Sequence, residues 1–206
     1  AEIYPYPPPI NENAKAFAEQ IQAQLVLGRA EALKFGGHSL SPLSFTLEDN
    51  GKKFVMCSLN GAACTWIASK VPALLIGCPL NASAVAKTAN QLRNKWSAKI
   101  TVVACGEQWS DALENENKLR PGIEDYLGAG MILSKLEGSK SPEAEVCVGA
   151  FEYSKKHFKE LLWECASGRE LRERGFGQDV QFCSQTDISQ HVPILCDGRF
   201  AGSQIY

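Results

Sequence analysis

The sequence lacks several features that would place the protein at a membrane or on a nucleic acid. No apolar stretch approaches the ~20 residues that a transmembrane helix needs, and the N-terminus has neither the basic region nor the apolar segment of a secretory signal. The formal net charge is only −2, so no strong overall field attracts a nucleic acid or an anionic membrane surface. We therefore expect a cytoplasmic protein without nucleic-acid or membrane partners, in which any site for an anion is built locally.

Common metal-binding and catalytic signatures are absent as well. The chain has no P-loop, no GxGxxG, no HExxH and no Ser-His-Asp order, and its three histidines are too scattered to suggest a metal cluster. The eight cysteines form no CxxC pair, which argues against a zinc site. Some of them, such as Cys57 and Cys78, follow apolar runs. This favours reduced core thiols over a disulfide framework in a chain long enough to form its own core.

The composition and the hydrophobic pattern are those of a globular α/β protein. The chain has 206 residues, of which 45% are hydrophobic and 21% charged. Strands are predicted at residues 2–6, 25–27, 53–57, 73–77, 99–105 and 194–200, and helices at 14–24, 62–68, 82–94, 123–136, 141–153, 158–164 and 168–175. Because strands and helices alternate from residue 25 to 136, we predict α/β/α layers with a mixed sheet, in one domain over residues 1–206 that can divide into two small lobes around one cleft.

Polar side chains gather where three of the predicted strands end. The first group is Gly28-Arg29-Ala30-Glu31, and the second is Ser58-Leu59-Asn60-Gly61. The third is Cys105-Gly106-Glu107, followed by Arg120 and the pair Glu124-Asp125. Ligands of open α/β sheets bind outside the carboxyl ends of the strands, so the three groups can line a single cleft.

The adjacent carboxylates Glu124 and Asp125 have two readings. They can favour the positive N-terminus of the helix that follows them. They can also bind Mg²⁺, which takes carboxylate oxygens and keeps several waters. Neighbouring residues point about 100° apart on a helix, which opposes a shared ion, but this restriction weakens at the junction of loop and helix.

The remaining polar groups are open to alternatives of the same kind. Arg29 and Arg120 can clamp an anion, or each can form a surface ion pair of little energetic value. Asn60-Gly61 is a turn signal, yet Ser58 to Gly61 ahead of a helix can also present backbone N–H groups to a phosphate or sulfonate. Asp179, Asp187 and Asp197 are interpreted as caps and turns.

Several short motifs follow one another along the chain from about Leu25 to Phe200. They are Leu40-Ser-Pro42, Ser58 to Gly61, Ile76 to Val85, Ala104 to Glu107, Glu124-Asp125 with Gly128-Ala-Gly130, Ala166-Ser-Gly168 with Leu171, Gly175-Phe176 with Asp179-Val180, and Val192-Pro-Ile194 with Asp197-Gly198. In their order and spacing, rather than in any one of them, these motifs resemble the 2-phosphosulfolactate phosphatase family, the Mg²⁺-dependent hydrolases of coenzyme M biosynthesis.

The resemblance implies hydrolysis of the phosphate monoester of 2-phosphosulfolactate or a similar small, doubly anionic hydroxyacid phosphate. It implies Mg²⁺ as cofactor, held by Glu124 and Asp125, with Glu107 and Asp125 as catalytic carboxylates. Substrate would be bound by the side chains or backbone of Arg29, Ser58, Asn60, Gly61 and Arg120.

Two departures from the family pattern limit what the resemblance implies. Family members begin with an extra strand carrying a Val-Asp-Val-Leu type motif, which nothing here matches. We therefore expect that the chain starts inside the family's fold, and the nucleophile stays unassigned. Gly28-Arg29-Ala30-Glu31 also reorders the charges of the family's Gly-Glu-Arg segment, which leaves the exact substrate open.

A second hypothesis is a non-catalytic member of the same fold that binds a small anion or a protein. The missing N-terminal motif is the observation behind it. A homo-oligomer is compatible with either function.

Overall fold

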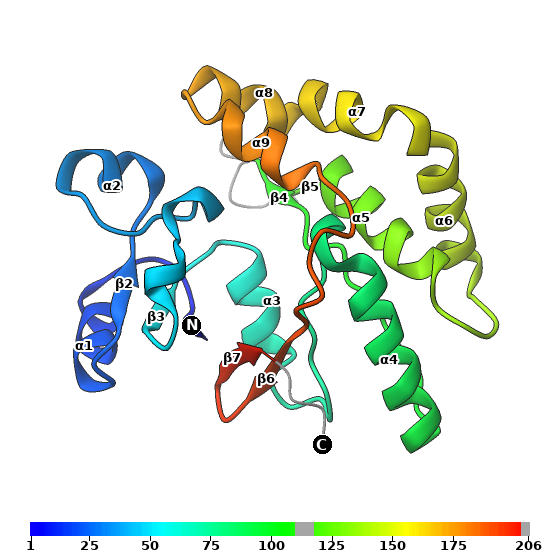
Figure 1. The fold of residues 1–206 in the computed structure, drawn as a ribbon, viewed down its shortest axis with the longest axis horizontal. Coiled ribbons are helices and arrows are strands. Elements are labelled where there is room, and N and C mark those ends of the chain that lie inside the picture. Colours follow the sequence, from blue (N-terminus) through cyan, green and yellow to red (C-terminus); the bar gives the residue numbers. More distant parts are fainter. Residues whose placement is uncertain (110–117, 203–206) are drawn as a thin grey trace. The chain divides into compact units, whose positions relative to one another are not determined.

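A five-stranded mixed sheet forms the centre of the first of two compact units. The computed structural model describes residues 1–109 and 118–202. The chain divides into Ala1–Leu75 with Pro193–Tyr206 as one unit and Ile76–Val192 as the other. The described elements of the first unit are β1 (Glu2–Pro5), α1 (Glu12–Gln20), β2 (Gln24–Val26), α2 (Arg29–Phe35), β3 (Lys53–Met56), α3 (Gly61–Ile67), β6 (Pro193–Cys196) and β7 (Arg199–Gly202), with 3₁₀ turns at Pro42–Ser44 and Leu47–Asp49 (Figure 1).

The strand order of this sheet is β2-β3-β1-β7-β6. β3 runs parallel to both of its neighbours, whereas β7 is antiparallel to β1 and to β6. The last two strands form a hairpin rather than the single strand predicted at 194–200. Its turn is the expected Asp197-Gly198, whose φ angles of 49° and 77° are the positive values that a tight hairpin turn requires.

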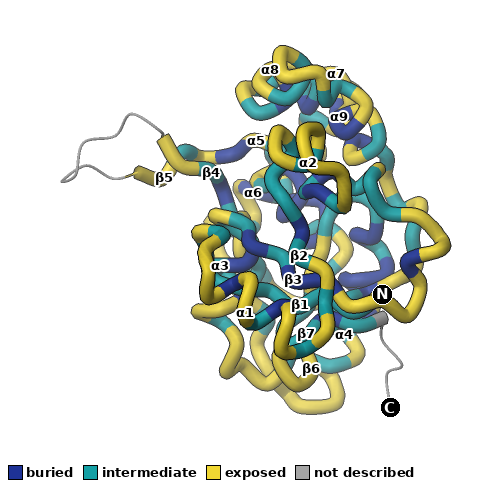
Figure 2. The backbone as a smooth tube through the Cα atoms, turned by 90° about the vertical axis from the view of Figure 1, so that its left-hand side faces the viewer, coloured by how far each residue is buried: buried dark blue, intermediate teal, exposed yellow. Residues whose placement is uncertain are grey.

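Helix α1 covers one side of the sheet. Ala14 and Ala18 are small and buried, so the helix packs closely on Val55 and Cys57 of the segment around β3. Asn11 caps the helix by accepting a hydrogen bond from the N–H of Ala14 at 3.0 Å. The two central residues of β3, Phe54 and Val55, are fully buried, whereas α2 lies largely in the exposed colour in Figure 2.

The segment at residues 36–49 is held by a buried carboxylate. Asp49 accepts hydrogen bonds from His38 Nε2, Lys52 Nζ and the Thr46 N–H, at 2.9, 2.9 and 2.8 Å. Hydrogen bonds from Lys52, Thr46 and His38 hold the pKa of Asp49 well below its usual range. His38 is therefore committed to a structural network within the first unit.

The second unit is mainly helical. Its described elements are α4 (Ala82–Trp96), β4 (Glu107–Gln108), β5 (Leu119–Arg120), α5 (Ile123–Ser134), α6 (Pro142–Ser154), α7 (Phe158–Glu164), α8 (Ala166–Glu173) and α9 (Gly177–Cys183), with 3₁₀ turns at Pro79–Asn81 and Lys155–His157. Strands β4 and β5 form a separate antiparallel ribbon. No helix in the described part of the chain has the length and apolar composition needed to cross a membrane.

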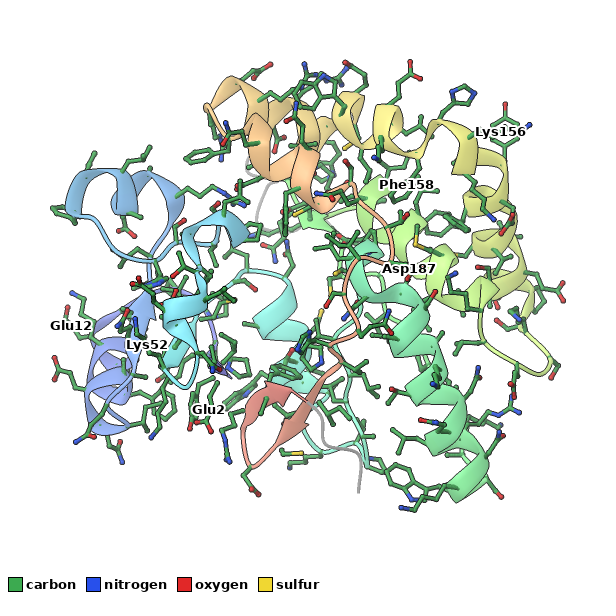
Figure 3. All side chains as sticks on the ribbon, viewed as in Figure 1. Glu2, Glu12, Lys52, Lys156, Phe158 and Asp187 are labelled. Atoms are coloured by element: carbon green, nitrogen blue, oxygen red, sulfur yellow. The ribbon has the colours of Figure 1, made fainter. Side chains whose placement is uncertain are left out.

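The N-terminus of α4 is capped by a residue that is distant in the sequence. Asn81 stands at the capping position, but its side chain accepts from the N–H of Cys78 and donates to the carbonyl of His191. Asp187 supplies the cap instead, since it accepts from both the N–H and the hydroxyl of Ser83 at 2.6 Å (Figure 3). The interpretation of Asp187 as a capping residue is thus confirmed.

Helices α5 and α6 pack closely because α5 carries small residues. A Cβ added at Gly130 would overlap the carbonyl oxygen of Cys147 and come within 2.8 Å of Phe151 Cβ. Gly128, by contrast, faces Pro79 at an ordinary distance of 3.6 Å. The close packing of α6 therefore requires the second glycine of the Gly-Ala-Gly sequence in α5.

Two predicted strands are wrong. Within the described residues, 99–105 form no strand, and 73–77 contribute only an isolated bridge between Leu75 and Ile194. Both runs are apolar, but a strand also needs a neighbour for its backbone hydrogen bonds, and a sequence pattern does not show whether one is available. The predicted class, α/β with a mixed sheet, is confirmed, and the two units agree with two small lobes. A single domain over 1–206 stays a prediction.

The close contact of α5 and α6 gives a first test. We expect Gly130→Ala to lower the free energy of unfolding by about 1–3 kcal/mol, because the methyl group must displace the backbone of α6. Urea unfolding followed by circular dichroism measures this change.

Gly149 of α6 is the matched control, since an added Cβ would meet nothing within 4 Å. Gly149→Ala should raise stability by about 0.5–1 kcal/mol through helix propensity. Equal effects of the two substitutions would contradict the packing account.

Candidate functional site

The turn that opens α5 brings two carboxylates to one point. Gly122 is the residue before the helix, and no side chain caps it. The position that a Cβ of Gly122 would occupy lies 2.9 Å from Asp125 Oδ2 and 3.2 Å from Glu124 Oε1. The two acidic side chains therefore turn back toward the start of the helix and converge, although their Cα–Cβ bonds diverge. Neighbouring side chains diverge on a regular helix, but this restriction is weaker at the junction of loop and helix, which permits the arrangement.

The β4–β5 ribbon adds further groups to the same turn. Gly106 has a φ of +69° and donates its backbone N–H to the Asp125 carboxylate. The next residue, Glu107, is paired in register with Arg120 of β5. A Cβ on Gly106 would lie 3.3 Å from the carbonyl oxygen of Arg120, so the two strands approach closely. We call Glu107, Glu124 and Asp125 the acidic turn.

The environment of the acidic turn makes it unfavourable for all three carboxyl groups to be ionised at once. Burial raises the pKa of Asp125 to about 6, the charges of Glu124 and Glu107 raise it as well, and the hydrogen bond from Gly106 opposes the rise. Asp125 therefore still binds a proton in part of the molecules near neutral pH. A divalent cation would supply the opposite charge that this cluster needs.

Arg120 lies beside the acidic turn and is held in one orientation. Its side chain is only 11% exposed, and its Nη1 and Nη2 donate to the two carboxylate oxygens of Glu170 in α8 at 3.1 and 3.2 Å. The guanidinium also lies over the ring of Trp109, 5.6 Å from the centroid. The bidentate pair uses two of the five N–H groups of the arginine.

Helix α8 reaches the acidic turn at a second point. The thiol of Cys165, which caps α8 by accepting from the N–H of Gly168, lies 3.7 Å from Glu124 Oε2. Burial raises the pKa of this thiol, and the charge of Glu124 contributes to the rise. No sequence pattern indicated a functional role for Gly122, Cys165 or Glu170, because each takes its role from a contact across the fold.

The other predicted site residues belong to the first unit. Arg29 opens α2 and donates from Nη2 to the carbonyl of Leu40 at 3.1 Å. The hydroxyl oxygen of Ser58 accepts from the N–H of Ala62 at 2.8 Å, and so it is turned toward α3. Asn60 and Gly61 form the start of that helix.

The eight predicted residues are thus divided between the two units. Glu107, Arg120, Glu124 and Asp125 lie together at the acidic turn. That this set shares one cleft with Arg29, Ser58, Asn60 and Gly61 stays a prediction.

The acidic turn fits a cation that needs few protein ligands. In the described ranges, 1–109 and 118–202, no three His, Cys, Asp or Glu side chains converge closely enough to hold a metal by themselves. Oxygens of both carboxylates approach Gly122, whose lack of a side chain allows them to lie 2.9 and 3.2 Å from the position that a Cβ would take. Two carboxylates with water and a substrate oxygen match the usual Mg²⁺ site and differ from the closed site of a structural zinc.

Fold and site together describe an α/β protein with paired carboxylates beside a fixed guanidinium. A family model described as 2-phosphosulpholactate phosphatase matches residues 3–198, and the chain belongs to this family.

Three relatives illustrate the similarity. The probable 2-phosphosulfolactate phosphatase of Pseudothermotoga lettingae is 32% identical over 197 residues, covering 93% of this chain and 80% of the relative. That of Caldanaerobacter subterraneus subsp. tengcongensis is 28% identical, covering 87% and 72%. The 2-phosphosulfolactate phosphatase of Methanothermobacter thermautotrophicus is 31% identical over 125 residues, covering 61% and 49%.

The raised pKa of Asp125 predicts that its charge destabilises the fold. The folded protein binds the proton more tightly than the unfolded chain, so stability falls as pH rises from about 4 to about 6 and stays lower above that range. We expect Asp125→Asn to be about 1–2 kcal/mol more stable than the parent protein at pH 8, allowing for solvent screening, and the gain to fade toward pH 4. Thermal unfolding across this pH range measures it.

Glu143, in the first turn of α6, is a control of opposite sign. Its own backbone N–H and the hydroxyl of Ser141 lower its pKa, so its charge stabilises the fold at neutral pH. Glu143→Gln should therefore reduce stability at pH 8. An Asp125→Asn protein that is no more stable than the parent at pH 8 would contradict the assigned electrostatics.

Proposed function

We propose that this protein is a Mg²⁺-dependent phosphatase that hydrolyses the phosphate monoester of 2-phosphosulfolactate or a similar small hydroxyacid phosphate. The observation that carries the proposal is the convergence of Glu124 and Asp125 at Gly122, beside Arg120. Membership of the family and the names of the relatives support the choice of substrate.

Glu124 and Asp125 would hold the metal through carboxylate oxygens that lie beside Gly122. Bound Mg²⁺ would offset negative charge on the phosphoryl oxygens and orient the reacting groups. Glu107 adds negative charge near this position, since its charge contributes to the raised pKa of Asp125. The carboxylates therefore act by position and charge, which is most of what phosphoryl transfer requires of a protein.

Arg120 would bind the anionic substrate. Because Glu170 takes two of its N–H groups, three donors remain for phosphate or sulfonate oxygens. Its low exposure, 11%, keeps the guanidinium from sampling many orientations, so little further ordering is needed on binding. A cation site and an anion site then lie at one turn, as a doubly anionic substrate needs. We assign no nucleophile among the described side chains.

Phosphate release from synthetic 2-phosphosulfolactate tests the proposed reaction directly. We expect turnover that EDTA abolishes and Mg²⁺ restores, and a loss of about 10²-fold or more in Asp125→Asn although that protein is stable. Activity should fall as pH drops below about 6, because the protonated form of Asp125 binds a cation poorly.

Metal-independent turnover, or full activity of Asp125→Asn, would contradict the proposed mechanism. Tight binding of sulfolactate without hydrolysis would favour the non-catalytic, anion-binding alternative instead.

The absence of a side chain at Gly122 gives a second test. Its backbone angles, φ −90° and ψ 120°, suit any residue, so Gly122→Ala should fold normally. Its methyl group would lie within 3.2 Å of an oxygen of each carboxylate and should weaken Mg²⁺ binding by about tenfold or more. Calorimetric titration with MgCl₂ measures the affinity.

Gly128→Ala, six residues along in the buried part of α5, is the control, because its added Cβ has ordinary packing distances. Equal Mg²⁺ affinities of the Gly122→Ala and parent proteins would contradict the assigned position of the metal.

A further inference from the structure

The ion pair between Arg120 and Glu170 sets the direction of the guanidinium. Nη1 of Arg120 donates to Oε1 of Glu170 at 3.1 Å and Nη2 donates to Oε2 at 3.2 Å, and the guanidinium lies over Trp109. A bidentate pair of this kind fixes the plane as well as the position of an arginine. Since the Glu170 side chain is 47% exposed, the pair lies at the edge of the unit and not in its core.

Arg120 has strong competing partners close by. Glu107 stands directly opposite it in the β4–β5 ribbon, and directly opposed residues of an antiparallel pair have Cβ atoms about 4.5–5.5 Å apart on the same face. Glu124 and Asp125 follow four and five residues later in the chain, and Gly106, which binds Asp125, packs against the carbonyl of Arg120. An arginine without Glu170 would be drawn toward these carboxylates.

Glu170 comes from a helix that is fixed to the acidic turn by other contacts. Cys165, the capping residue of α8, lies 3.7 Å from Glu124. Gly168 allows α8 to approach the end of α7 so closely that a Cβ would overlap the carbonyl oxygen of Leu162. Helix α8 therefore holds Glu170 at a defined distance from the carboxylates.

We propose that Glu170 is a positioning residue that keeps the Arg120 guanidinium away from Glu107, Glu124 and Asp125, so that these carboxylates bind a cation while Arg120 binds an anion. The inference rests on the proposed function. Glu170 acts through Arg120 and touches neither ligand. Its charge is the essential property, because an uncharged side chain cannot compete with three nearby carboxylates for the guanidinium.

The chain contains a matched ion pair that serves as a control. Arg172 Nη2 donates to Glu164 Oε2 at 3.2 Å, and its guanidinium lies over the ring of Trp163, 4.6 Å from the centroid. This pair uses the same three residue types as Arg120, Glu170 and Trp109. Glu164→Gln removes the same charge from a partner of an arginine that does not face Glu107 across the ribbon.

Calorimetric titration of the full chain with MgCl₂, and separately with inorganic phosphate, tests the proposal. We expect Glu170→Gln to weaken both Mg²⁺ and phosphate binding by about tenfold, because Arg120 then neutralises the carboxylates and leaves the anion site. Glu170→Asp, which keeps the charge, should recover part of both affinities. Glu164→Gln should bind both ligands as the parent does, and a crystal structure of Glu170→Gln should show Arg120 against Glu107.

The outcomes separate this proposal from the proposed function. Parent-like Mg²⁺ and phosphate affinities in Glu170→Gln would overturn the role of Glu170, as would the same losses in Glu164→Gln, which would indicate general damage to α8. A parent protein that binds Mg²⁺ but hydrolyses no phosphate ester would overturn the proposed function alone. A parent protein that binds no Mg²⁺ would overturn both.

Discussion

The convergence of two negative side chains on one residue without a Cβ is the constraint on which the rest of the site depends. Glu124 and Asp125 can meet at Gly122 only because no side chain occupies the space between their oxygens. Their mutual repulsion and burial raise the pKa of Asp125 to about 6. The N–H of Gly106 and the N-terminus of α5 offset part of this repulsion. The protein thus carries a local electrostatic cost that a bound cation would remove, as is common for functional sites.

The helices of the second unit fix the charges around that point. The close contact of α5 with α6 at Gly130 anchors the helix that carries both carboxylates. The β4–β5 ribbon places Gly106 and Glu107 beside Asp125 and sets Arg120 opposite Glu107. Helix α8 then holds the guanidinium through Glu170. The same packing that forms this unit therefore determines where positive and negative charge lie at its site.

The sequence predicted local features well and distant contacts poorly. The Asp197-Gly198 turn and most helices follow from neighbouring residues alone, and they are confirmed. The strands predicted at 73–77 and 99–105 are wrong, because strand formation depends on a partner that periodicity does not reveal. Glu124 and Asp125 were predicted as site residues from their residue types and their order along the chain. Glu170 and Cys165, by contrast, become relevant only once α8 is placed beside the acidic turn.

The central claim, that the acidic turn is a cation site with a proton to displace, is tested most directly by calorimetry. MgCl₂ would be titrated into the parent protein at pH 6 in two buffers of different ionisation enthalpy. Because burial raises the pKa of Asp125 to about 6, the account predicts saturable Mg²⁺ binding with net release of protons, and no release in Asp125→Asn. Absence of Mg²⁺ binding, or binding with the same proton release in Asp125→Asn, would contradict it.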